Sequence, residues 1–255
     1  MRIVIKIGTS TLTHRSGNLN IRHIEQLCKV ASDLKNAGHE IILVSSGAIG
    51  MGVGKLGLSE RPTDMPTKQA AAAVGQCELM YFYDKLFSEY NHTVGQILIT
   101  GQDLENTERH ANFRNTVERL LTLGALPIIN ENDTVATDEI KVGDNDTLAA
   151  IVATATGAEL LILLSDIDGL FDADPRKNPN ATLIPNVYEM NDKILSLAGG
   201  AGSTLGTGGM KTKLFAAGLC IANGCDMVIA NGEHPEYLYD IAEGKPVGTR
   251  FHSKK

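Results

Sequence analysis

The feature that most constrains this chain is its repeated alternation of short apolar runs with longer amphipathic segments. Residues 41–44 form a continuous run of Ile, Ile, Leu and Val, typical of a strand buried on both faces. Before it, apolar residues recur at helical spacing from Ile21 up to Gly38, with Asn20 placed to cap the helix. The pattern predicts strands near 2–7, 41–44, 94–99, 126–129, 160–164 and 227–230, and further helices near 67–90, 103–123, 145–156, 210–223 and 235–243. Such alternation predicts an α/β fold, a three-layer αβα sandwich with a mostly parallel central sheet.

The domain organisation follows from the absence of interruptions in this alternation. No Pro/Ser-rich linker, charge block or fixed-period repeat divides the sequence, so we expect a single domain over residues 1–255. Two stretches look irregular. Residues 166–187 are rich in Pro, Asp and Asn and read as a surface excursion, and residues 199–209 contain six glycines among eleven residues.

Charge and composition exclude several function classes. With 23 basic and 30 acidic residues the net charge is −7, opposite to the footprint of a nucleic-acid binder, so we expect no nucleic-acid partner. The four cysteines have neither zinc-site nor disulfide-framework spacing and are expected to be reduced, structural thiols. Lys6 comes too early for a signal peptide, and no apolar run approaches the roughly 18 residues of a membrane helix. We therefore expect a soluble, cytoplasmic protein with no membrane partner.

Polar residues follow the predicted strands where a ligand would bind. In open α/β sheets, ligands bind beyond the carboxyl ends of the strands. The segments at these ends are 6–10 (Lys-Ile-Gly-Thr-Ser), 45–47 (Ser-Ser-Gly), 130–134 (Asn-Glu-Asn-Asp-Thr) and 165–169 (Ser-Asp-Ile-Asp-Gly). This edge of the sheet is the expected site.

Three glycine-containing turns could bind an anion through backbone N–H groups at a helix start: 8–10, 46–47 and 206–213. The last resembles a Walker A loop only superficially, because Met210 replaces the second obligatory glycine. Its competing interpretation is a flexible connection, but Lys211 and Lys213 beside the helix start favour anion binding.

Other motifs have simpler structural interpretations. Residues 52–57 match the dinucleotide pattern G-x-G-x-x-G, but they do not directly follow a strand, and a small-residue helix or loop is favoured. Asn145 or Asp146 in the segment 143–147 can simply cap a helix. Asp166 and Asp168 lack the remaining ligands of a calcium loop. The histidines show no metal-ligand spacing, and no Ser/His/Asp arrangement is evident.

Taken together in order, six motifs resemble the glutamate-phosphorylating branch of the amino acid kinase family. The motifs span 6–10, 44–49, 130–135, 142–146, 166–171 and 206–213, and the resemblance covers essentially all 255 residues. Many members of this branch carry a C-terminal PUA domain. Because this sequence ends at Lys255, we expect no PUA domain.

The resemblance implies the reaction, its partners and its site residues. The implied activity is ATP-dependent phosphorylation of the γ-carboxylate of L-glutamate, the first step of proline biosynthesis, with Mg²⁺ bridging the nucleotide phosphates and no metal ligands from the protein. It further implies a homo-oligomer and feedback inhibition by proline. The implied catalytic residues are Lys6, Lys213 and Asp146, with Asp146 holding the two lysines. The implied glutamate-binding residues are Ser46, Asp133, Asn145 and Asp144. The implied nucleotide-binding residues are Lys6, Gly8, Thr9, Gly47, Ser165, Asp166, Thr207, Gly208, Gly209, Met210, Lys211, Thr212 and Lys213.

Asp133 also makes sense without the resemblance. A carboxylate beside an anionic substrate would repel it unless it faced an ammonium group, which glutamate provides. Three alternatives stay open. The first is a sister kinase acting on N-acetylglutamate, carbamate, UMP or aspartate, against which the segments 130–135 and 143–146 argue. The second is a non-catalytic amino-acid-binding regulatory protein, against which Lys6 and Lys213 argue. The third is a nicotinamide-binding oxidoreductase, which rests only on residues 52–57.

Overall fold

The computed structural model describes residues 1–14, 18–136, 145–197 and 209–254. In this part of the chain, eight strands form one sheet in the order β3-β4-β2-β1-β5-β7-β8-β6. The strands from β3 to β7 in that order pair in parallel, and β8 pairs antiparallel with β7. The strands are β1 Arg2–Ile7, β2 Glu40–Ser45, β3 Val94–Ile99, β4 Leu126–Glu131, β5 Leu160–Ser165, β6 Asn186–Val187, β7 Asp226–Asn231 and β8 Thr249–Phe251. The predicted mostly parallel sheet is confirmed.

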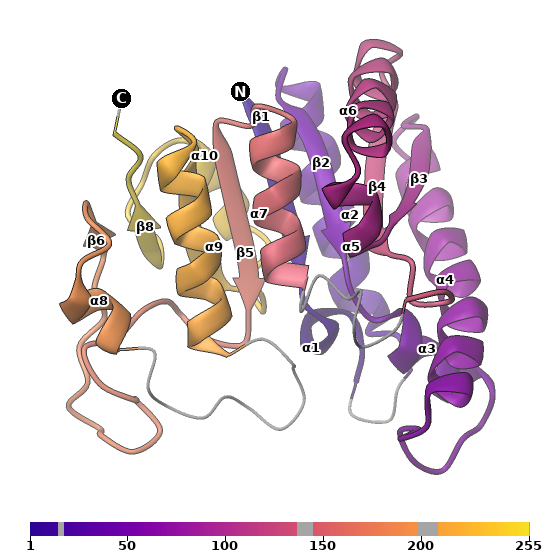
Figure 1. Cartoon of the computed structure of the whole chain (residues 1–255), viewed down its shortest axis with the longest axis horizontal. Helices are drawn as coiled ribbons and strands as arrows, with labels where there is room; N and C mark the ends of the chain where they lie inside the picture. Colours follow the sequence, from indigo (N-terminus) through magenta and orange to yellow (C-terminus); the bar gives the residue numbers. More distant parts are fainter. Residues whose placement is uncertain (15–17, 137–144, 198–208, 255) are drawn as a thin grey trace.

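Helices cover both faces of the sheet and complete three layers. In Figure 1, α6 (Thr107–Thr122), α7 (Asn145–Ala155) and α9 (Met210–Ala222) lie in front of the sheet, and α2 (Ile21–Asn36) and α10 (Tyr237–Ala242) lie behind it. The helix α4 (Met65–Ser88) contributes side chains to the same core as α2. Two apolar cores result, one on each face. The αβα sandwich expected from the alternation is confirmed.

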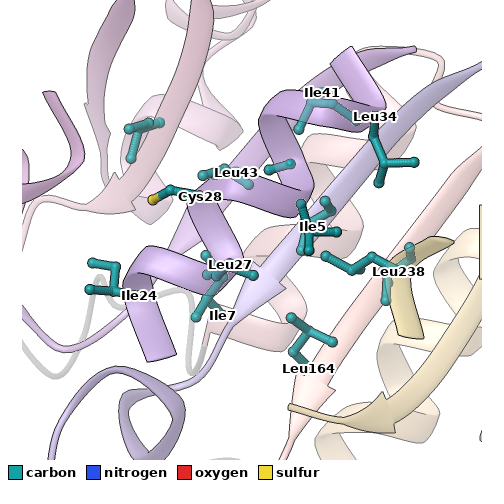
Figure 2. Close-up of a cluster of buried hydrophobic side chains, with 14 of the residues drawn as sticks. Ile5, Ile7, Ile24, Leu27, Cys28, Leu34, Ile41, Leu43, Leu164 and Leu238 are labelled. Carbon is teal, nitrogen blue, oxygen red and sulfur yellow. The ribbon is translucent and has the colours of Figure 1, made fainter. Parts of the chain in front are cut away.

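The core behind the sheet shows how strand alternation sorts side chains. Ile5 and Ile7 of β1 point into this core, where they lie with Leu27 and Leu34 of α2 (Figure 2). Burying each such aliphatic side chain, rather than leaving it exposed to water, stabilises the folded state by about 1.5–3 kcal/mol. Val4 and Lys6, which alternate with them on β1, therefore point to the opposite face, where Val4 joins the second core and β1 contacts α7. The same alternation that builds the core thus directs Lys6 to the opposite face.

The cysteines behave mostly as small apolar residues. All four are free thiols, and Cys28, Cys220 and Cys225 are buried. Burial raises the pKa of the Cys28 thiol well above its ordinary value, so this side chain stays neutral. Cys28, Cys220 and Cys225 are buried, as is typical of structural thiols, whereas Cys77 lies exposed on α4.

Residues 52–57 form part of a close contact between two helices. The helix α3 (Ala48–Lys55) packs against α4, and a Cβ atom at Gly52 would lie 1.8 Å from the carbonyl oxygen of Ala71. A Cβ atom at Gly75 would lie 1.7 Å from the carbonyl oxygen of Ala48. Only glycine at both positions allows this approach. The small-residue helix interpretation of the G-x-G-x-x-G match is therefore confirmed.

One predicted helix is divided in two. The segment expected as a helix over 103–123 consists of α5 (Gly101–Glu105) and α6. Thr100 and Asp103 form a capping box on α5, and the side chain of Asn106 accepts a hydrogen bond from the backbone N–H of Arg109 at the start of α6. These side chains satisfy the free N–H groups of two separate helix starts and so favour the break.

The remaining elements are short, and the sequence pattern did not indicate them. They are α1 (Thr9–Leu12), α8 (Asp192–Ser196), the edge strand β6 and its neighbour β8. The stretch 166–187 is largely exposed and irregular, as expected, with a bridge between Phe171 and Leu183 and β6 at its end. Among the described residues, no helix has the length and apolar character needed to cross a bilayer.

Candidate active site

A buried ion-pair centre lies at the carboxyl end of β1. The ammonium Nζ of Lys6 lies 2.7 Å from Oδ1 of Asp146, and Nζ of Lys213 lies 2.8 Å from Oδ2 of the same carboxylate. Lys6 comes from β1, Asp146 from the first turn of α7 and Lys213 from the first turn of α9. Residues far apart in the sequence thus meet because α7 and α9 pack side by side on the face to which Lys6 points (Figure 1).

Electrostatics keep the carboxylate of Asp146 ionised. Burial alone would raise its pKa, since its side chain is only 1% exposed. The charges and hydrogen bonds of Lys6 and Lys213 outweigh burial and hold the pKa of Asp146 below its ordinary value. Two cations and one anion leave a formal charge of +1, which suits a site for phosphate groups.

Two glycines stand where the chain turns beside this centre. Gly8 caps α1, and a Cβ atom there would lie 3.7 Å from Nζ of Lys6. Gly47 caps α3 with φ of +94°, a left-handed conformation that strains any residue with a side chain. The backbone can therefore approach a ligand closely at both positions. Thr9 begins α1 directly after Gly8.

A cavity of about 610 Å³ lies beyond the carboxyl ends of β5 and β7, beside the start of α9. Its lining includes Asp166, Met210, Lys213 and Asn231. Lys213 belongs both to this lining and to the ion-pair centre, so the cavity reaches the charged group. Its volume lies within the range of about 300–1,000 Å³ that is usual for ligand pockets.

Hydrogen bonds fix polar side chains along the cavity wall. The amide Nδ2 of Asn231 donates to Oδ1 of Asp168 over 2.8 Å, and Oγ of Ser165 donates to Oδ1 of Asp166 over 3.2 Å. The predicted nucleotide-binding residues Ser165 and Asp166 therefore lie at this cavity, the latter in its lining.

Amide and hydroxyl groups form a second, uncharged cluster at the ends of β2 and β4. The Nδ2 atom of Asn145 donates to the carbonyl oxygen of Ser45 over 2.7 Å, to Oγ of Ser46 over 2.8 Å and to Oδ1 of Asn130 over 3.2 Å. We call Ser46, Asn130 and Asn145 the amide edge. Asn145 directly precedes Asp146 in α7, so the amide edge and the ion-pair centre are adjacent.

The other predicted residues fall in three groups. Gly209 caps α9 and accepts a hydrogen bond from the hydroxyl of Thr212, while Lys211 is exposed beside them. Asp133 is half-buried in the turn after β4. Asp144, Thr207 and Gly208 lie outside the described residues.

Three polar residues that were not among the predicted site residues belong to the site region. Asn130 was visible as a polar residue at a strand end, which is the signal that could have marked it. Asn231 follows the same rule at the end of β7. Gln76 lies within the long helix α4, where no sequence motif marks it. Its Oε1 accepts a hydrogen bond from Nδ2 of Asn130 over 2.9 Å. Only the tertiary structure identifies it.

A helix-covered parallel sheet with a cationic centre at the carboxyl ends of its strands is an α/β architecture suited to binding an anionic ligand at that edge. The chain belongs to the amino acid kinase family, whose sequence profile, described as "Amino acid kinase family", matches residues 1–231.

Particular relatives and solved structures agree with this. Over 258 residues the chain is 53% identical to "Glutamate 5-kinase" of Clostridium perfringens, covering 100% of this chain and 96% of that protein. It is 56% identical over 250 residues to "Glutamate 5-kinase" of Clostridium acetobutylicum, covering 98% and 94%. Among solved structures, the carbamate kinase from Giardia lamblia bound to AMP-PNP has a TM-score of 0.69 at 17% identity, covering 99% of this chain and 98% of that one. The UMP kinase from Ureaplasma parvum has a TM-score of 0.67 at 18% identity, with the same coverage. The structures share the fold.

Proposed function

We propose that this chain transfers the γ-phosphoryl group of ATP to the γ-carboxylate of L-glutamate, the first step of proline biosynthesis. The observation that carries the proposal is the near-full-length identity above 50% with relatives named glutamate 5-kinase. The ion-pair centre supports it, because it brings two lysines to the edge of the sheet where a ligand binds.

The chemistry requires charge stabilisation rather than proton removal. The acceptor is a carboxylate at neutral pH, so no general base is needed. The site must instead gather several anionic oxygens and stabilise the charge that develops during transfer. Lys6 and Lys213 supply the cations for this task, and Asp146 positions both through its two oxygens.

The cavity of about 610 Å³ is the proposed nucleotide site, with Lys213 at the point where the phosphates would meet the ion-pair centre. When bound, Mg²⁺ would neutralise charge on the nucleotide phosphates. Among the described residues, no three His, Cys, Asp or Glu side chains gather closely enough to hold a metal ion. In proteins, Mg²⁺ is usually bound by one or two carboxylates together with substrate phosphates and water.

Glutamate would bind at the amide edge. Ser46 and Asn145 offer short hydrogen-bonding groups there, and Asp133 in the turn after β4 supplies the counter-charge for the α-ammonium group. Asp144 remains part of this proposal from the family resemblance alone.

A substrate panel tests the proposed function directly. ADP release is measured with glutamate, N-acetylglutamate, aspartate, carbamate and UMP as acceptors. We expect turnover with glutamate at least tenfold more efficient than with any other acceptor, the discrimination that a lost polar contact costs. Preference for another acceptor would move the chain to a sister activity, and ATP binding without turnover of any acceptor would favour a non-catalytic protein.

Asp133→Asn tests how glutamate is selected. The substitution keeps the shape and one acceptor but removes the charge. The fall in kcat/KM for glutamate should correspond to a loss of about 2–4 kcal/mol of transition-state stabilisation, while the KM for ATP changes much less. Asp84→Asn, on the exposed side of α4, is the matched control. N-acetylglutamate, which has no ammonium group, should be a poor substrate of the wild type. An unchanged KM for glutamate would show that Asp133 does not contact the amino group.

Two partner expectations extend the proposal. The family resemblance supports a homo-oligomer, which sedimentation of the active enzyme would test. It also supports feedback inhibition by proline, which a titration of proline into the glutamate assay would test. A monomeric active enzyme, or activity that proline leaves unchanged, would contradict the respective expectation.

A further inference from the structure

The amide of Asn130 is held in one orientation by three neighbours. Its Oδ1 accepts from the backbone N–H of Glu131 over 2.9 Å and from Nδ2 of Asn145 over 3.2 Å. Its Nδ2 donates to Oε1 of Gln76 over 2.9 Å. Asn130 is 1% exposed and Gln76 is 7% exposed, so water competes little for these bonds.

Rotating this amide by 180° would mismatch every contact. Nδ2 would then face the N–H of Glu131 and the NH₂ group of Asn145, both of which are donors, while Oδ1 would face the acceptor on Gln76. Glu131 and Asn145 require an oxygen from Asn130, and Gln76 supplies the acceptor that takes up the opposite end. Gln76 therefore helps to select the orientation that Asn145 needs.

The helix that carries Gln76 is held close to the amide edge. Gly75, the preceding residue, allows α4 to approach the carbonyl oxygen of Ala48, two residues after Ser46. Within the described part of the chain, Nε2 of Gln76 is buried and has no hydrogen-bond partner. An unmet buried donor is unfavourable, and an apolar side chain of similar size would avoid it. The structure retains the amide, which points to a use for its oxygen.

We propose that Gln76 is a positioning residue for the acceptor substrate. It acts through Asn130 on Asn145, and thereby on Ser46, without contacting the substrate itself. The inference rests on the proposed function in placing the acceptor at the amide edge, and it adds a residue from the interior of α4 to the determinants of acceptor binding.

Gln76→Met is the primary test, because it keeps a similar volume and removes the acceptor. Loss of one buried hydrogen bond in the relay should raise the KM for glutamate about tenfold, with kcat and the KM for ATP changing less than about twofold. Gln76→Glu retains an oxygen acceptor at the same position and should keep the KM for glutamate within about threefold of the wild type. Leu79→Val, a packing change one turn further along the buried face of α4, is the control and should leave both KM values unchanged.

A double-mutant cycle separates orientation from packing. In Asn130→Asp, both side-chain ends are oxygens, so either rotation presents an acceptor to Asn145. Whatever the added charge does by itself, Gln76→Met should then cause less than about a twofold further change in the KM for glutamate. A full tenfold effect in both backgrounds would overturn the proposal.

The remaining outcomes are also decisive. A wild-type KM in Gln76→Met, an equal rise in Leu79→Val, or a Gln76→Glu variant as impaired as Gln76→Met would each overturn the inference. If Gln76→Met does not fold, the Gln76→Glu result alone decides, since a tenfold rise there would contradict it. If the substrate panel identifies another acceptor, the proposed function fails, while the same comparison on that acceptor still tests Gln76.

Discussion

The ion-pair centre and the amide edge are neighbours at the carboxyl end of one sheet, but they are built by opposite means. In the centre, Asp146 binds Lys6 and Lys213 through full charges, over 2.7 and 2.8 Å. At the edge, Asn145 and Asn130 are held by neutral hydrogen bonds to backbone and side-chain oxygens. Under the proposed function, the centre stabilises charge that develops during phosphoryl transfer, and the edge recognises the bound acceptor. Disrupting the ion-pair centre should therefore change stability and kcat, whereas disrupting the amide edge should change the KM for glutamate.

The largest expected effect follows from removing the charge at the centre. Asp146→Asn keeps the shape of the side chain but leaves two buried ammonium groups without a counter-ion. Breaking a buried ion pair in this way should destabilise the fold by about 3–5 kcal/mol. Denaturant unfolding measures the loss, with the exposed Asp84→Asn as control. An Asp146→Asn variant as stable as the control would show that the lysines are hydrated or neutral in the folded protein.

The lysines should affect catalysis more than folding. Lys6→Ala or Lys213→Ala should each lower kcat by about 10²–10³, the cost of deleting one preorganised stabiliser of developing charge. Lys245→Ala, in an exposed ion pair with Asp240, provides a matched control that should leave kcat unchanged. Wild-type kcat in both active-site variants, with native melting behaviour, would rule out the centre as the site of phosphoryl transfer.

The pH dependence of stability sharpens the contrast, because only the centre contains a titrating group. The pKa of Asp146 is lower in the folded protein than its ordinary value, despite burial, owing to Lys6 and Lys213. Its stabilising contribution is therefore complete above the ordinary pKa of about 3.9 and is lost as the pH falls through the lower, folded-state value. The difference in unfolding free energy between wild type and Asp146→Asn should stay constant from neutral pH down to about pH 5 and shrink below about pH 3.9. A difference that already shrinks near neutral pH would contradict this assignment.

The sequence predicted the charged region better than the neutral one. Lys6 and Lys213 stand beside glycines at a strand end and at a helix start, so local rules place them at the ligand edge. Their pairing with Asp146 was expected from the family resemblance alone. Gln76 has no such signal, because its importance depends on the packing of α3 against α4 through Gly52 and Gly75. Contacts between distant segments of this kind leave no local pattern.

The fold shows the same division. The buried strands were predicted from short apolar runs, as at 41–44, and helices such as α2 from apolar residues at helical spacing. The break between α5 and α6 was missed, since Asn106 had to be recognised as a cap within an otherwise helical pattern. The short strand β8 has three residues, too few for alternation, and it is defined by pairing with β7 and β6.

The smallest expected effect comes from a neutral hydrogen bond beneath the amide edge, between the hydroxyl of Tyr83 and Oγ of Ser45 at 2.9 Å. Burial raises the pKa of Tyr83, so its hydroxyl stays protonated, and Tyr83→Phe removes one neutral bond worth about 1 kcal/mol. For a chain of this length the melting temperature should fall by about 2–4 °C. Catalysis should not change, because Asn145 contacts the backbone oxygen of Ser45 and not its side chain.

Ser46→Ala is the informative comparison: it removes the hydroxyl that Asn145 does contact and should raise the KM for glutamate. Equal KM values in Tyr83→Phe and the wild type, with a higher value in Ser46→Ala, would show that the side chain of Ser46 takes part in glutamate binding and that Tyr83 contributes only to stability. A rise in KM in Tyr83→Phe as large as in Ser46→Ala would instead extend the recognition surface down to α4.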